Sequence, residues 1–67
     1  MSLGTVKWFN EQKGYGFIVP DNGGGDVFVH ISAVEKSGLR TLSDGQKVSY
    51  DISRDRGKDA AANLRVL

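Results

Sequence analysis

The aromatic side chains of this chain, together with its single histidine, have the clearest potential for binding chemistry. Tyr15 and Phe17 alternate in the segment YGFIV, and Phe28 and His30 alternate in the segment DVFVH. Successive side chains of a strand point to opposite faces, so each of these pairs lies on one face. Aromatic rings displayed on a sheet can stack unpaired bases without strict sequence choice, because every base has a π-face.

The same rings could instead fill the protein core, because aromatic side chains are usually buried. Ile18, Val27 and Val29 on the opposite faces would then be turned toward water. A histidine is a poor core residue, and Lys7 and Lys13 stand at the ends of the aromatic segments, where lysines can contact phosphates. These observations favour an outward-facing platform of rings over an aromatic core.

Catalytic and metal-binding chemistry has little support in the sequence. His30 has no cysteine or second histidine to work with, so a stacking or hydrogen-bonding role is favoured over that of a general base. Asp21 and Asp26 bracket a triple glycine but lack the alternating oxygen ligands of a calcium loop, which favours a turn. No phosphate-binding loop of the form GxxxxGK[ST] is present. We predict no enzyme, no metal site, no cofactor and no small-molecule substrate.

Short alternating segments separated by glycine and proline predict the elements that would position these side chains. Pro20 should end the second strand, and PDNGGGD should form a hairpin loop. Ser32 and Glu35 fit a capping box and predict one helical turn, and SDGQ at 43–46 predicts a turn. Gly14 and Gly16 would permit the bend that a closed sheet needs. The five predicted strands cover residues 3–10, 15–20, 26–30, 46–54 and 60–67.

A closed barrel would remove the exposed edges of such a small sheet, so we expect an all-β barrel. Trp8 and Phe9 are adjacent, so at least one of them should lie outside the core. The alternation predicts a core made of Val6, Ile18, Val27, Val29, Val48, Tyr50, Ile52, Leu64 and Val66.

Length and composition limit the partners. The 67 residues predict one domain, 1–67, without cysteines to staple it. Neither a targeting segment nor an apolar run of membrane-spanning length is visible, so we expect a monomeric cytoplasmic protein with no membrane partner. The net charge of +1 is too small for binding nucleic acid by charge alone, so stacking would have to supply much of the affinity. RDRGKD at 54–59 alternates in sign and predicts a solvated loop.

The segments themselves resemble a known family. KGYGFI at 13–18 is similar to an aromatic RNA-binding motif, K/R-G-F/Y-G/A-F-V-x-F/Y, with Ile18 in place of valine and Pro20 at the last position. GTVKWFN, KGYGFI, DVFVHIS, LSDGQKVSYDI and AAANLRVL follow in the order and spacing of bacterial cold shock proteins. The resemblance covers essentially the whole chain. It implies a five-stranded antiparallel barrel of the oligonucleotide-binding (OB) fold that binds single-stranded RNA and DNA and acts as an RNA chaperone.

The resemblance also implies a set of binding residues. Asp21 lies near this surface and is a candidate for a hydrogen bond to a base edge. Ile31 and Leu39 stand where the family usually has aromatic residues, so we expect weaker binding or a shorter footprint, with apolar contact remaining. The positions that match the family's binding surface are Lys7, Trp8, Phe9, Asn10, Lys13, Tyr15, Phe17, Phe28 and His30.

One alternative comes from another functional class. A protein-interaction barrel resembling an SH3 domain also displays aromatic residues, which hold proline-rich peptides. The lysines beside the rings and the agreement across five segments argue against it.

Overall fold

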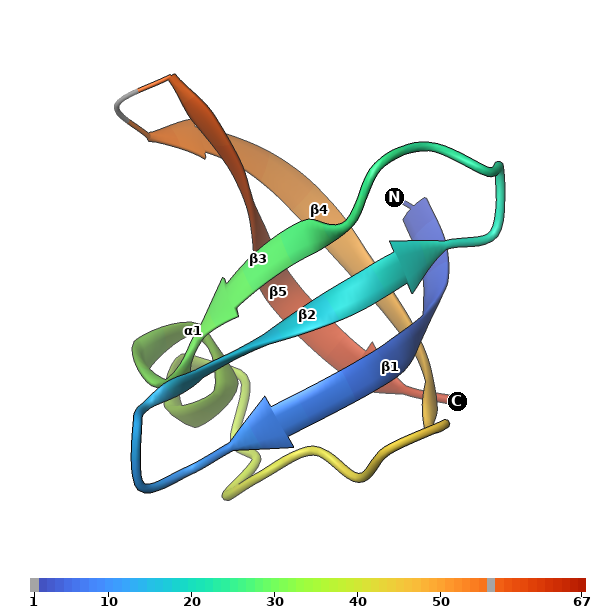
Figure 1. Cartoon of the computed structure of the whole chain (residues 1–67). Coiled ribbons are helices and arrows are strands. Elements are labelled where there is room, and N and C mark those ends of the chain that lie inside the picture. Colours follow the sequence, from blue (N-terminus) through green and yellow to red (C-terminus); the bar gives the residue numbers. More distant parts are fainter. Residues whose placement is uncertain (1, 56) are drawn as a thin grey trace.

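The computed structural model describes residues 2–55 and 57–67, so Met1 of the predicted domain and Arg56 of the RDRGKD segment lie outside the described residues. Five strands close into a barrel in the order β1-β2-β3-β5-β4, with one short helix, α1, between β3 and β4 (Figure 1). The predicted all-β barrel is confirmed, and the strand boundaries agree within two residues. The elements are β1 (Ser2–Asn10), β2 (Tyr15–Pro20), β3 (Val27–His30), α1 (Ile31–Lys36), β4 (Lys47–Asp55) and β5 (Lys58–Val66).

One junction of the barrel departs from the expected antiparallel arrangement. β3 and β5 run parallel and are in register at Phe28 and Ala60, whereas the other neighbouring strands are antiparallel. The reason is geometric, because five strands in a closed ring cannot all alternate in direction. The parallel junction lies where the long connection through α1 separates β3 from the β4–β5 hairpin.

The core forms on the inner faces of the strands, as the alternation predicts for seven of the nine expected residues. Val6, Ile18, Val27, Val29, Val48, Tyr50 and Leu64 are buried there, joined by Ala61, Val34 of α1 and Leu42 of the connection. The prediction that Tyr15, Phe17 and Phe28 point outward is therefore confirmed. Putting the valines and Ile18 inside fills the narrow barrel with compact branched side chains.

Ile52 and Val66 were predicted in the core but are exposed, at 52% and 43% of their surface. The β4–β5 pairing shifts between Ser49 and Asp51, and Asn63 has a left-handed φ of 50°. Two residues of β5 therefore oppose one of β4, which is a β-bulge and reverses the alternation along β5, so that Ala61 and Leu64 are both buried. The pairing of β4 with β1 runs from Lys47 to Tyr50, so Ile52 lies on the part of the β4–β5 hairpin beyond that pairing, and Val66 is the last residue of β5. The tip of this hairpin extends away from the other strands (Figure 1).

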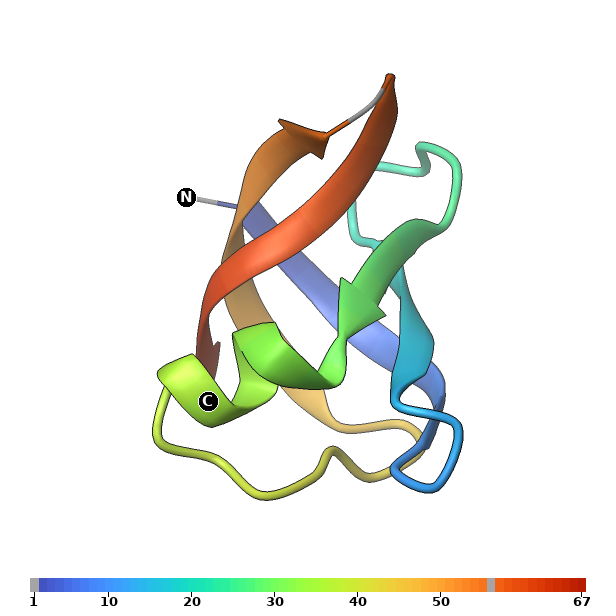
Figure 2. The ribbon, with the colours of Figure 1, turned by 90° about the vertical axis from the view of Figure 1, so that its left-hand side faces the viewer.

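The helix α1 covers one end of the barrel and packs against β3 and β5 (Figure 2). It is longer than the predicted single turn, and its N-cap is His30 rather than Ser32. The capping-box interpretation is therefore wrong, because the histidine ring accepts the Ser32 N–H instead. The predicted turn at 43–46 is confirmed by a hydrogen bond from Gln46 N to Ser43 O, at 3.1 Å.

Candidate functional site

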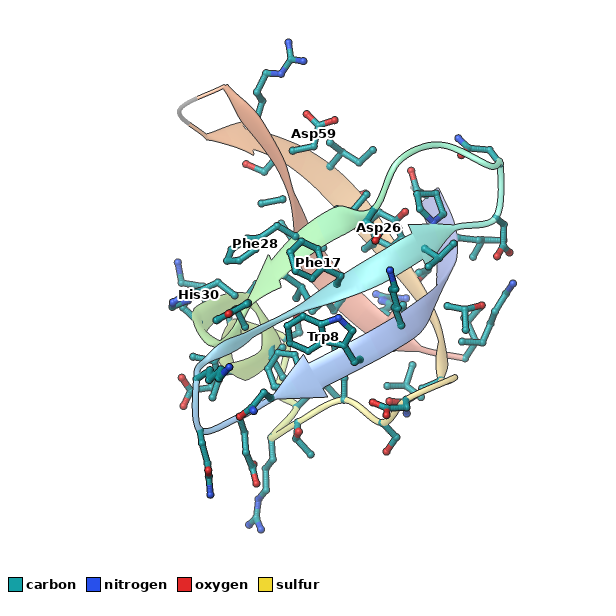
Figure 3. All side chains as sticks on the ribbon, viewed as in Figure 1. Trp8, Phe17, Asp26, Phe28, His30 and Asp59 are labelled. Carbon is teal, nitrogen blue, oxygen red and sulfur yellow. The ribbon has the colours of Figure 1, made fainter. Side chains whose placement is uncertain are left out.

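Five side chains from three adjacent strands form one outer face, which we call the ring cluster: Trp8, Tyr15, Phe17, Phe28 and His30. The register makes them neighbours, because Phe17 lies opposite both Trp8 and Phe28, and Tyr15 lies opposite His30. Figure 3 shows Trp8, Phe17 and Phe28 side by side across β1, β2 and β3, with His30 at the end of β3. The four aromatic residues are half-buried and His30 is exposed.

The rings of the cluster support one another mainly through edge-to-face contacts. Trp8 lies 5.6 Å from Tyr15 and 5.4 Å from Phe17, measured between ring centroids. Tyr15 and Phe28 are stacked at 5.8 Å, with 24° between their planes. Such contacts hold aromatic side chains in place by about 0.5–1.5 kcal/mol per pair beyond burial. The cluster is therefore a preformed surface of half-exposed rings.

A β-bulge in β1 decides which of two adjacent aromatic residues joins the cluster. Val6 pairs with Ile18 and Trp8 with Phe17, so Lys7 is an extra residue between them. The bulge turns Trp8 outward and leaves Phe9 inward, where it packs against the core. Phe9, although predicted at the binding surface, is thus not brought into the ring cluster.

Gly16 is required by the close approach of β1 rather than by a bend. A Cβ at this position would lie 2.4 Å from the carbonyl oxygen of Trp8 and 2.7 Å from the Cα of Phe9. Any side chain there would push β1 away from β2, and the rings that the two strands carry would separate. Gly14, by contrast, has a φ of +83° and serves the turn between these strands.

Two lysines of the barrel, Lys7 and Lys47, are paired with carboxylates. Lys7 Nζ lies 3.2 Å from Asp26 Oδ2, with both side chains about half-exposed. Lys47 pairs in the same way with Asp21, the predicted base-edge residue. Lys13 is exposed on the turn after β1. The two aspartates that bracket the glycine loop therefore each pair with a lysine, and the predicted turn is confirmed by the hydrogen bond from Gly23 N to Pro20 O, at 3.2 Å.

His30 has a fixed orientation at the edge of the cluster. Its Nδ1 accepts the backbone N–H of Ser32 at 3.1 Å and lies 2.9 Å from Ser32 Oγ. An Nδ1 that accepts a hydrogen bond carries no proton, so the neutral imidazole carries its proton on Nε2. The ring lies 6.3 Å from Phe28, and its Nε2–H is the donor that remains for a ligand.

Three further predicted residues lie around the cluster rather than in it. The Asn10 side-chain oxygen accepts the backbone N–H groups of Gln12 and Lys13, so it shapes the β1–β2 turn. Ile31 is the half-buried first residue of α1, and Leu39 is half-buried against the core. The structure therefore brings together the rings, but not every residue that the resemblance implied.

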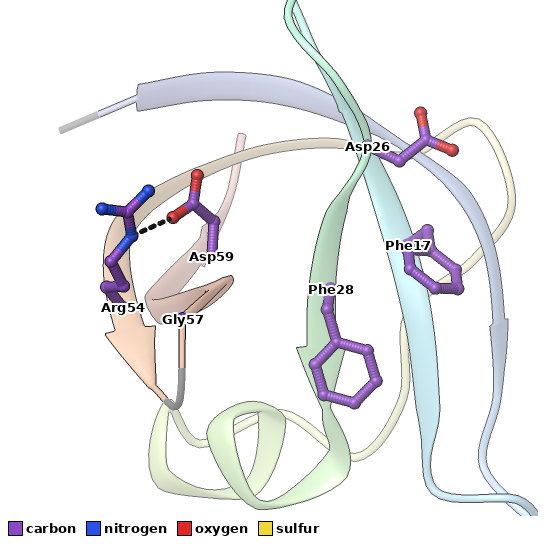
Figure 4. A pocket seen from close by; sticks show the side chains of 6 residues that line it. All are labelled: Phe17, Asp26, Phe28, Arg54, Gly57 and Asp59. Atoms are coloured by element: carbon purple, nitrogen blue, oxygen red, sulfur yellow. Dashed lines mark ion pairs between the residues drawn. The ribbon is translucent and has the colours of Figure 1, made fainter.

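A pocket of about 320 Å³ adjoins the ring cluster on the side of the β4–β5 hairpin (Figure 4). It includes Arg54 and Asp59, which form an ion pair at 3.4 Å, although the sequence predicted only a solvated loop there. Local charge alternation gave no sign of this placement, because it depends on the β3–β5 junction between distant residues. The residues that line the pocket are Phe17, Asp26, Phe28, Arg54, Gly57 and Asp59.

Two other features were sought among the described residues, a metal site and a membrane-spanning helix. Within residues 2–55 and 57–67, no three His, Cys, Asp or Glu side chains gather closely enough to hold a metal ion. In the same part of the chain, no helix is long and apolar enough to cross a membrane.

Comparisons with known proteins agree with this geometry. The family model described as 'Cold-shock' DNA-binding domain matches residues 2–67. The chain is 64% identical to a probable cold shock protein, y4cH, of Sinorhizobium fredii and to cold shock protein CspA of Rhizobium meliloti, each over 97% of both chains. It is 50% identical to cold shock-like protein CspE of Escherichia coli, over 96% of this chain and 93% of that protein.

Proposed function

Since the chain belongs to the cold-shock domain family of non-enzymatic nucleic-acid-binding proteins, we propose that its ring cluster binds single-stranded RNA and DNA. The observation that carries this proposal is the sharing of one half-exposed face by the rings of β1, β2 and β3. Unpaired bases can leave their own stack and lie on such rings, whereas the faces of paired bases are already covered within the duplex. The surface therefore favours single strands.

The proposed contacts follow from where each side chain lies. The ring cluster supplies stacking, and His30 supplies a donor through Nε2. Lys7 and Lys13 supply charge for phosphates, and Phe9 supports the surface from the core side. Residues at the margin of the proposed interface are Asn10, Asp21, Ile31 and Leu39.

Stacking rather than charge should dominate the affinity. Lys7 and Lys47 already pair with carboxylates, and the net charge is only +1. A phosphate that reaches Lys7 must displace Asp26, which reduces the electrostatic gain. The slope of log Kobs against log salt depends on the number of phosphates neutralised, so we expect a shallow slope. A slope as steep as that of a protein with six or more phosphate contacts would contradict this account.

We further propose that the protein acts as an RNA chaperone without an energy source. Binding the open form of a hairpin, and not the paired form, stabilises the open form by RT ln(1 + [L]/Kd). At a hundredfold excess over Kd this is about 2.7 kcal/mol, which melts weak stems and leaves strong ones. Effects on transcription antitermination or translation would follow where such stems control them. We expect the active species to be a monomer.

Binding should be weaker than in relatives that carry aromatic residues at the positions of Ile31 and Leu39. Both side chains are apolar and half-buried, so they offer contact but no ring face. Each stacked base is worth about 1–3 kcal/mol, so two missing rings should be measurable. Oligothymidine affinity equal to that of a relative with both rings would contradict this.

Trp8 fluorescence provides the direct test. Oligothymidine should quench it by stacking, and a proline-rich peptide should leave it unchanged. The opposite result would favour the protein-interaction barrel of the SH3 type. A fluorophore-quencher RNA hairpin with a weak stem should then open on addition of protein, while a hairpin with a long GC-rich stem should stay closed.

A further inference from the structure

The pocket beside the ring cluster has walls of two chemical kinds (Figure 4). Phe17 and Phe28 contribute ring surface, and Asp26 and Asp59 contribute carboxylates. Gly57 lines the same pocket without adding a side chain. The volume of about 320 Å³ leaves room for one base beyond those that stack on the rings.

The charges indicate which part of a strand can enter. Two carboxylates at one pocket repel a phosphate, and among the described residues that line it the one cationic side chain, Arg54, is paired with Asp59. A neutral base suffers no such repulsion and gains ring contact with Phe28. The pocket should therefore hold a base and leave its phosphate outside.

The carboxylates also indicate which base. A carboxylate only accepts hydrogen bonds, and its two oxygens match two parallel N–H donors. Guanine presents two adjacent donors, N1–H and the N2 amino group, on its Watson–Crick edge. Thymine and uracil present one donor between two carbonyl oxygens, and cytosine and adenine present an amino group beside a ring acceptor. We propose that Asp59 makes this pocket selective for guanine.

Asp59 is able to exchange its present partner for a base. Its Oδ1 lies 3.4 Å from Arg54 Nε, and the two side chains are 49% and 76% exposed. Exposed ion pairs of this kind contribute little, so replacing or sharing the contact has a small cost. The other carboxylate of the pocket, Asp26, forms an ion pair with Lys7. Asp59 is therefore the carboxylate that we assign to the base.

This inference rests on the proposed binding of single strands, and the test keeps the two apart. Heptathymidine is titrated first, with Trp8 quenching as the signal. Seven further oligonucleotides then carry one guanine each, at successive positions. We expect one position, or two adjacent ones, to raise affinity about fivefold or more. Inosine at that position lacks the amino group and should lose most of the gain.

Three variants identify the group responsible. Asp59→Asn should abolish the guanine preference, while Asp44→Asn, in the turn at 43–46, should keep it with the same change in net charge. Arg54→Gln removes the ion pair but leaves the carboxylate, so the preference should remain. If Arg54→Gln lost the preference and Asp59→Asn kept it, the arginine would be the selecting group.

Each outcome has a distinct meaning. Failure of heptathymidine to quench Trp8 would overturn the proposed function and this inference with it. Normal quenching with no guanine preference at any position would overturn only the selectivity of the pocket. A guanine preference that survives Asp59→Asn would also overturn it.

Discussion

Replacing Tyr50 by phenylalanine should make the protein more stable. The Tyr50 side chain is 1% exposed, and its hydroxyl has no hydrogen-bond partner within the described part of the chain. A buried polar group without a partner costs about 1–3 kcal/mol, and phenylalanine keeps the ring without that group. We expect the free energy of unfolding to rise by about 1 kcal/mol, which raises Tm by about 4–8 °C in a domain of this size.

The measurement is urea and thermal unfolding followed by circular dichroism, at neutral pH. Tyr15→Phe serves as the matched control, because the same atom is removed from the half-exposed ring cluster rather than from the core. It should change stability by much less. If Tyr50→Phe were as stable as the original chain, or less stable, the hydroxyl would have a favourable interaction and the reasoning would be refuted.

The alkaline range gives a second readout of the same hydroxyl. Burial, and then the charge of Asp21, raise the pKa of Tyr50 above its ordinary value of about 10. The unfolded chain therefore loses this proton at a lower pH than the folded chain does. The free energy of unfolding is then unaffected by this group below pH ~10 and decreases as the pH rises further. Phenylalanine does not ionise, so the stability advantage of the variant should widen above pH ~10. An advantage that stays constant or narrows would contradict the direction of the shift.

Three further predictions address the packing and the interface. Gly16→Ala would place a Cβ 2.4 Å from a backbone oxygen of β1, so we expect the free energy of urea unfolding to fall by about 2 kcal/mol or more. In the control variant Gly25→Ala the new Cβ has no atom within 4 Å, so the free energy of unfolding should change little. Phe17→Ala removes the ring at the centre of the cluster and should weaken oligothymidine binding about tenfold; a loss under twofold in a folded variant would count against stacking. Ile31→Phe should strengthen that binding about fivefold, while Ile52→Phe on the exposed part of β4 should not; equal effects would indicate general hydrophobicity.

Local alternation predicted most of this fold because it reports directly on strand faces. It placed Ile18, Val27 and Val29 inside and Tyr15, Phe17 and Phe28 outside, and both placements hold. The β2–β3 pairing depends on one hairpin, so its register follows from turn residues that the sequence displays.

The errors occur where a single residue breaks the alternation. The extra residue Lys7 in β1 turns Trp8 outward and Phe9 inward. The bulge at Asn63 in β5 turns Ala61 rather than Ala62 inward. A bulge depends on how the partner strand fits, and no residue type in these segments demands one. Exposure of Ile52 has a different cause, because Ile52 lies beyond the Lys47–Tyr50 stretch in which β4 pairs with β1.

The site was predictable where residues of one strand share a face, and not where distant segments meet. Two alternating segments predicted Tyr15, Phe17, Phe28 and His30 of the ring cluster, and the family resemblance added Trp8. Asp59 lies in the pocket beside Phe17 and Phe28 because β5 pairs with β3. No local sequence pattern predicts that pairing. The capping role of His30 was missed because Ser32 and Glu35 offered a more familiar signal two residues later.

The order of the strands along the chain has a consequence for how the molecule is made. Every member of the ring cluster lies in the first thirty residues, whereas the strands that close the barrel, β4 and β5, begin at residue 47. The β1–β2–β3 meander alone leaves Val6, Ile18, Val27 and Val29 without a cover, because the strands that close over its inner face come from the last third of the chain. The proposed binding surface is therefore built by a local part of the sequence, whereas the core behind it needs distant contacts. Until those contacts form, the apolar face is exposed and prone to aggregation.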